Sequence, residues 1–142
     1  MPLADISPHL IDALIVSEDQ RFYSHSGVDG RALFRATAQR LFRSGTASGA
    51  STISMQLARI VEPRPRTLGS KLIEISRARQ MERIWTKQEI LEKYLNTVPW
   101  GGTLRGAEAA ARYWFGKRAR DLTTVEAATL VAMLPAPSRR SP

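Results

Sequence analysis

Helix start and stop signals recur along most of the chain and constrain its fold more than any other feature. Thr86 with Glu89, and Thr123 with Glu126, have the spacing of a capping box, in which both side chains accept backbone N–H groups of the first helical turn. The prolines in residues 62–67 (EPRPRT) cannot donate to a helical ladder, so a helix must end before them. We find no clear period-two segment of the kind that marks a half-buried strand. The sequence therefore predicts a mostly α-helical protein.

Caps, breakers and apolar spacing together set the expected helices. Ser7 followed by Pro8 is typical of a helix start, and Asp29 is a suitable N-cap for a second helix. The expected helical ranges are 8–23, 29–43, 51–61, 67–85, 86–95, 107–115 and 123–134. A chain of 142 residues fits one compact domain, 1–142, and we expect residues 136–142 to be a frayed tail.

The net positive charge favours partners that carry negative charge. The chain carries 21 basic and 13 acidic side chains, and its net charge is +8. Most of the basic residues are arginine, whose planar guanidinium suits phosphate oxygens. The arginines are spread over every segment, with no clustered basic helix, so nucleic acid is not an expected partner. No apolar run approaches the ~20 residues of a membrane-spanning helix, and no export signal is recognisable.

The stretch SEDQRFYSHSG (17–27) places two adjacent carboxylates directly after an apolar run. The helical stripe formed by Ile11, Leu14 and Ile15 continues onto Glu18, which predicts a desolvated carboxylate suited to proton exchange. Asp19 would lie about 100° further round the same helix and stay more solvated. The alternative is a pair at the helix end that bonds to the neighbouring arginine or histidine, and the spacing alone leaves both interpretations open.

Several blocks of sequence, in order, resemble the signatures of the peptidoglycan glycosyltransferases, glycosyltransferase family 51. The first signature, Glu-Asp-x-x-Phe-x-x-His-x-Gly, is matched by residues 18–27, and the second, Gly-x-Ser-Thr-Ile/Leu-x-Gln-Gln, resembles GASTISMQ (49–56). Met55 stands where most members carry the first glutamine. SKLIE (70–74) resembles Arg-Lys-x-x-Glu, with Ser70 in place of the arginine. Residues 86–102 and 109–117 resemble the fourth and fifth regions.

The resemblance implies a lysozyme-like helical domain with two lobes, here truncated at both ends. It implies an enzyme that polymerises lipid II into glycan strands, with inversion at the anomeric carbon and release of polyprenyl pyrophosphate. Lipid II and the growing glycan chain would be its substrates, moenomycin its inhibitor and cell-wall synthesis proteins its partners. Its location would be the periplasmic face of the bacterial inner membrane.

The resemblance also assigns expected site residues. Glu18 would be the general base that takes the proton of the acceptor hydroxyl, and Glu74 would be the second catalytic carboxylate. The residues expected to bind substrate are Asp19, Ser51, Thr52, Gln56, Arg59 and Lys71. No cofactor is obligatory in this interpretation, but a divalent cation, Mg²⁺ or Mn²⁺, could bind at Glu74.

Two other functions remain open at this stage. A folded but inactive remnant of such a domain would act at most as a binding module. A lysozyme-like enzyme that cleaves peptidoglycan would also use one glutamate, as an acid instead of a base. The cations expected at a departing pyrophosphate, Lys71 and Arg59, favour the transferase, because glycan cleavage releases no such group.

Overall fold

The computed structural model describes residues 1–35 and 50–134. In this part of the chain the α-helices are α1 (Pro8–Glu18), α3 (Ile53–Val61), α4 (Leu68–Ile84), α5 (Lys87–Thr97), α6 (Ala107–Phe115) and α7 (Thr124–Met133). Short 3₁₀ turns occupy η1 (Leu3–Asp5), η2 (Phe22–Ser24) and η3 (Ala119–Asp121). Residues 30–35 are helical as well, and the described residues contain an isolated bridge, Pro99 to Arg105, but no named strand. The mostly α-helical prediction is confirmed.

Threonine hydroxyls cap the starts of α4, α5 and α7. Thr86 and Thr123 each form a complete capping box with the glutamate three residues later. Thr67 accepts the N–H of Ser70 and begins α4. Local chemistry therefore sets these starts, because each hydroxyl satisfies a backbone donor that the first turn leaves without a partner. The expected end of the second helix at residue 43 and the tail at 136–142 lie outside the described residues.

The first helix is shorter than its pattern predicts. It ends at Glu18, and Asp19 leaves the helical conformation with φ −159° and ψ 71°. Phe22 is nevertheless fully buried, because it returns to the core through η2. Ser7 does occupy the N-cap position, but its hydroxyl donates to the carbonyl of Leu122 instead of capping α1.

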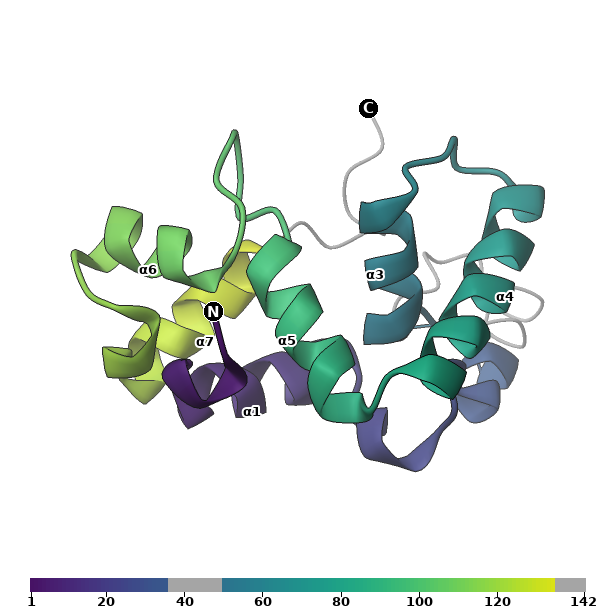
Figure 1. Cartoon of the computed structure of the whole chain (residues 1–142), viewed down its shortest axis with the longest axis horizontal. Helices are drawn as coiled ribbons and strands as arrows, with labels where there is room; N and C mark the ends of the chain where they lie inside the picture. Colours follow the sequence, from purple (N-terminus) through teal and green to yellow (C-terminus); the bar gives the residue numbers. More distant parts are fainter. Residues whose placement is uncertain (36–49, 135–142) are drawn as a thin grey trace.

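The helices form two groups joined by α5 (Figure 1). Helix α1 packs against α7, and α6 lies against α7 and η3. Helices α3 and α4 form the other group, and α5 contacts α3, α4 and α6. Large side chains such as Tyr94 and Trp100, both 1% exposed, fill the core where α5 meets its neighbours. This arrangement is consistent with the expected two-lobed helical domain.

A close approach fixes the loop of the first motif against α4. Gly27 has φ +86°, and a Cβ atom on it would lie 2.8 Å from the backbone of Ala78. Only glycine permits both the backbone conformation and the contact, so the loop after α1 can lie directly on α4.

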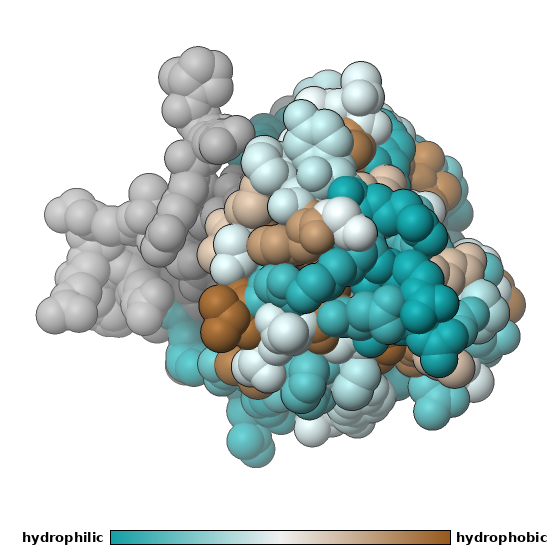
Figure 2. All heavy atoms as spheres, turned by 90° about the vertical axis from the view of Figure 1, so that its left-hand side faces the viewer, coloured by the Kyte–Doolittle hydropathy of each residue, from teal (hydrophilic) through white to brown (hydrophobic). Residues whose placement is uncertain are grey.

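The surface is mixed in character. Figure 2 shows the face on the α6 side, where hydrophobic side chains appear between hydrophilic ones. No helix in the described part of the chain is long and apolar enough to cross a bilayer.

Candidate active site

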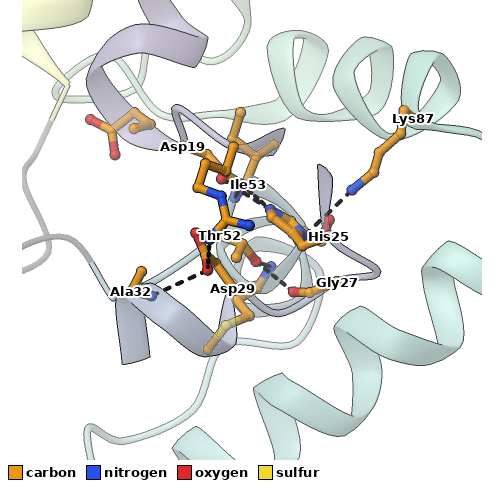
Figure 3. A network of polar contacts seen from close by, with 12 residues as sticks. Asp19, His25, Gly27, Asp29, Ala32, Thr52, Ile53 and Lys87 are labelled. Carbon is orange, nitrogen blue, oxygen red and sulfur yellow. Dashed lines mark hydrogen bonds and ion pairs between the residues drawn. The ribbon is translucent and has the colours of Figure 1, made fainter. Parts of the chain in front are cut away.

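The carboxylate of Asp19 links the loop after α1 to the start of α3 (Figure 3). Its Oδ2 accepts the backbone N–H of Ile53 at 3.0 Å and lies 2.9 Å from Nε2 of His25. Asp19 is only 7% exposed. The expectation that Asp19 stays more solvated than Glu18 is therefore wrong: the helix ends at Glu18, so helical spacing no longer describes where the next side chain points.

The other face of His25 meets a second charged pair. Nζ of Lys87 lies 3.5 Å from Nδ1 of His25 and donates to Glu82 at 2.7 Å. Glu82 also accepts the hydroxyl of Ser54, which is fully buried. This network joins the first-motif loop to α3, α4 and α5, so its direct effect is to hold these elements together.

Thr52 is the N-cap of α3 and is also buried. Its hydroxyl donates to the carbonyl of Gly27 at 2.6 Å and accepts the N–H of Met55 at 3.2 Å. Both roles of the hydroxyl are thus used within the protein. The sequence predicts that Thr52 binds substrate, and in this arrangement its observed contacts are structural.

Asp29 caps the helical segment 30–35, as its position in the sequence predicts. Its Oδ1 accepts the backbone N–H groups of Arg31 and Ala32. The same oxygen forms an ion pair with the guanidinium of Arg21. Burial alone would raise the pKa of this carboxyl, but these hydrogen bonds and the arginine charge outweigh it and lower the pKa.

Glu18, the last residue of α1, is held by a side chain from α3. Nε2 of Gln56 donates to Glu18 Oε2 at 2.9 Å, and the Tyr94 hydroxyl donates to Oε1 of the same carboxamide at 2.8 Å. Glu18 is half-buried, whereas Tyr94 is almost completely buried. No cation within hydrogen-bonding range of Glu18 occurs among residues 1–35 and 50–134, so its described partner is a neutral amide.

The second predicted carboxylate lies among cations. The guanidinium of Arg59 makes a bidentate contact with the Glu74 carboxylate, in which Nε donates at 2.6 Å and Nη2 at 2.8 Å. Lys71 lies 3.4 Å from the same carboxylate and donates to the hydroxyl of Ser51 at 2.5 Å. A residue from the loop before α3, one from α3 and two from α4 thus form a cationic cluster, which we define as Ser51, Arg59, Lys71 and Glu74.

Burial and charge act against each other in the cationic cluster. Burial would raise the pKa of Glu74, but the hydrogen bonds and charges of Arg59 and Lys71 prevail and lower it. Burial lowers the pKa of the Lys71 ammonium, and the Arg59 charge adds to this effect, although Glu74 opposes it. Glu74 therefore stays ionised, and the cluster holds two cations against a single carboxylate.

Helix α3 contributes a side chain both to the contacts of Glu18 and to the cationic cluster. Gln56 and Arg59 are three residues apart on this helix, so their side chains occupy neighbouring positions on its surface. Gln56 reaches the end of α1, while Arg59 reaches α4. The fold thus brings Glu18 and the cationic cluster to one helix, whereas Asp19 and Thr52 belong to the buried network at its N-terminus. Sequence reasoning treated Tyr94 as core, and no local signal distinguishes it from its apolar neighbours.

The described residues do not offer an evident cage for a divalent cation. Both oxygens of Glu74 already bind guanidinium or ammonium groups. Within the described ranges no three carboxylate, histidine or cysteine side chains gather as metal ligands would. The donor set at Glu74 as arranged here does not fit a divalent cation, and we derive no step through one.

An open groove lies elsewhere on the α3–α4 pair. Its lining residues are Ala58, Val61, Glu62, Arg77, Gln80, Met81, Ile84 and Trp85. None of the predicted site residues lines it, so we assign the chemistry to the side-chain clusters and not to this groove.

Two departures from the family signatures have different surroundings. Met55 is fully buried, where a glutamine would need partners for its amide. Ser70 lies in the first turn of α4, with its hydroxyl 2.9 Å from that of Thr67. The cationic cluster forms without an arginine at position 70.

Comparison with known proteins gives a consistent family. The family model described as Transglycosylase matches residues 1–142. The chain is 43% identical over 140 residues to penicillin-binding protein 1C of Escherichia coli (strain K12), covering 99% of this chain and 18% of that protein. It is 46% identical over 143 residues to the biosynthetic peptidoglycan transglycosylase of Rhodospirillum centenum, covering 100% of this chain and 62% of that protein.

A third relative, penicillin-binding protein 1F of Bacillus subtilis (strain 168), is 38% identical over 139 residues, which are 97% of this chain and 20% of that protein. The chain thus spans less than two thirds of the length of each of these relatives. Because the family model matches along the entire chain, and the signature residues cluster around α3 in the fold, the chain belongs to the transglycosylase family.

Proposed function

We propose that this chain is the peptidoglycan glycosyltransferase domain, or part of it, of an enzyme that polymerises lipid II. The observation that carries the proposal is that two side chains of α3 have different partners. Gln56 donates to the Glu18 carboxylate as a neutral amide, whereas Arg59 belongs to the cationic cluster. Glu18 has the surroundings of a proton acceptor, and Arg59 with Lys71 has those of a pyrophosphate site. A disaccharide carried on a polyprenyl pyrophosphate requires both functions.

The proposed reaction joins the donor glycan chain to the 4-hydroxyl of the acceptor sugar. The Glu18 carboxylate takes the proton from the 4-hydroxyl of the acceptor sugar while that oxygen forms a bond to the anomeric carbon of the donor. The bond from that carbon to the pyrophosphate oxygen breaks, and polyprenyl pyrophosphate leaves with the electron pair. Attack opposite the leaving group inverts the anomeric carbon. Help from a positioned general base is typically worth ~10²–10⁴ in rate.

The cationic cluster would stabilise the leaving group. Arg59 and Lys71 already stand in fixed geometry, so no large reorganisation is needed when negative charge develops on the pyrophosphate. Glu74 would act through them, by holding Arg59 in place. The hydroxyl of Ser51, which accepts a hydrogen bond from Lys71, would lie beside the leaving group as well.

The setting of the reaction is part of the proposal. The name of one relative, biosynthetic peptidoglycan transglycosylase, supports a role in peptidoglycan synthesis. Membership of the family supports the periplasmic face of the inner membrane as the place of that role. The membrane surface, other cell-wall synthesis proteins and inhibition by moenomycin are expected on the same ground. No cofactor is obligatory in this proposal, and chelation tests whether Mg²⁺ or Mn²⁺ contributes to activity.

The test is polymerisation of fluorescent lipid II by the 142-residue chain in detergent, with Mg²⁺ or with a chelator. Glu18→Gln is compared with Glu62→Gln, which removes a carboxylate from an exposed ion pair. We expect glycan strands from the parent chain and from Glu62→Gln, loss of product in Glu18→Gln, and inhibition by moenomycin. A folded parent chain that makes no product would favour the inactive remnant, and shortening of preformed glycan would favour a cleaving enzyme.

A further inference from the structure

We propose that Tyr94 is a positioning residue, whose buried hydroxyl orients the Gln56 carboxamide so that its N–H group donates to Glu18. The inference deepens the proposed function and rests on it, because it concerns how the proposed base is held. It also changes the interpretation of Gln56, which the family resemblance assigns to substrate binding.

The geometry forms a chain of three side chains from three helices. The Tyr94 hydroxyl on α5 donates to Gln56 Oε1 at 2.8 Å, and Gln56 Nε2 on α3 donates to Glu18 Oε2 at 2.9 Å. Tyr94 is 1% exposed and belongs to the main core cluster. Helix α3 packs directly on α5, so the first two members of the chain stand on helices that contact each other.

The chemistry of the two ends fixes the direction of the amide. A carboxamide presents an acceptor at its oxygen and two donors at its nitrogen. An anionic carboxylate at one end requires the nitrogen to face it, and a phenol that donates at the other end requires the oxygen to face the phenol. The reversed amide would place its oxygen against the Glu18 carboxylate, and two acceptors would then face each other without a proton between them.

Burial keeps Tyr94 in the donating form. Burial raises the pKa of its hydroxyl far above the ordinary value, and the negative charge of Glu18 acts in the same direction. The hydroxyl therefore keeps its proton at any pH at which the chain would function, and it remains able to donate to Gln56.

The consequence for Glu18 is positional. Glu18 is the final residue of α1 and is half-buried, so its carboxylate would otherwise have considerable rotational freedom. A reacting group that is displaced by about 1 Å can lose ~10²-fold in rate. The hydrogen bond from Gln56 holds the carboxylate, and Tyr94 ensures that Gln56 offers a donor.

The experiment compares Tyr94→Phe with Tyr113→Phe, which removes the same hydroxyl from an exposed tyrosine on α6. The first readout is kcat and KM for lipid II polymerisation. The second is the side-chain NH₂ signal of Gln56 in a ¹⁵N-labelled chain, recorded by NMR without substrate. The thermal midpoint of each variant shows that it is folded.

We expect Tyr94→Phe to lower kcat by ~10-fold to ~100-fold with little change in KM, and to shift the Gln56 signal. Tyr113→Phe should leave both unchanged. An unchanged Gln56 signal in folded Tyr94→Phe overturns the inference, and so does a shifted signal with undiminished kcat in an active chain. If no chain polymerises lipid II but Tyr94→Phe alone shifts the Gln56 signal, the amide orientation is supported and the proposed function fails.

Discussion

Glu18 and Glu74 are both predicted catalytic carboxylates, but the fold surrounds them differently. Glu18 lies at the end of α1, is half-buried, and its described partner is a neutral amide of Gln56. Glu74 lies inside α4, is 7% exposed, and binds Arg59 at two points with Lys71 nearby. The residue type is the same, but the two glutamates belong to different signatures and have opposite environments.

The contrast indicates different roles for the two carboxylates. A carboxylate that bonds to neutral donors can accept a proton without breaking an ion pair. Glu74 cannot, because protonating it would leave the Arg59 charge partly buried without a partner. We therefore assign proton transfer to Glu18, and to Glu74 the task of holding cations for the leaving group.

Glu18→Gln should give the largest effect of the set. We expect polymerisation of lipid II to fall by ~10²–10⁴. The thermal midpoint should stay close to that of the parent chain, because the variant amide can still accept a hydrogen bond from Gln56. Activity assays and calorimetry on the same preparation check both statements. A large loss of stability would remove the contrast with Glu74.

Glu74→Gln should instead act on stability. Breaking a buried ion pair typically costs 3–5 kcal/mol, and because Arg59 is a quarter exposed we expect a loss of about 2–4 kcal/mol in the free energy of unfolding. Urea denaturation at neutral pH measures this difference. Lys71 and Arg59 would also be released, so polymerisation should fall as well.

The pH dependence of this loss follows from the lowered pKa of Glu74. The unfolded chain takes up the proton near the ordinary pKa of 4.5, while the folded chain does so at lower pH. The stabilisation from Glu74 is therefore complete above that value and declines as the pH falls through the folded pKa. The difference between parent and Glu74→Gln should be constant near neutrality and shrink in acid. A difference that grows in acid would contradict the assignment.

Asp19→Asn tests the carboxylate next to Glu18 and should give the smallest effect. The asparagine oxygen can still accept the N–H of Ile53, but the charged contact with His25 is lost. We expect a loss of about 1–2 kcal/mol in the free energy of unfolding. If Asp19→Asn abolishes polymerisation in a chain of parental stability, Asp19 contacts substrate and its structural assignment is wrong.

Much of the fold could be predicted from local signals. Helices α4, α5 and α7 begin at hydroxyl caps, and α6 spans the apolar segment that the pattern predicts. The pattern predicts the first helix over 8–23, but the helix ends at Glu18, so local signals do not find its end. Glu18 fits the stripe and is half-buried, but nothing local shows that Asp19 leaves the helix to bond with the start of α3.

The helical class, most helix starts and the family signatures can be recognised without the structure, because a cap, a proline or a motif acts within a few residues. The packing of the helices, in contrast, sets which carboxylate is paired with cations and which is not. Arg59 and Glu74 are 15 residues apart, and Gln56 is 38 residues from both Glu18 and Tyr94. Such contacts depend on how α1, α3, α4 and α5 pack, since burial and charge around a side chain come from elements distant in the chain.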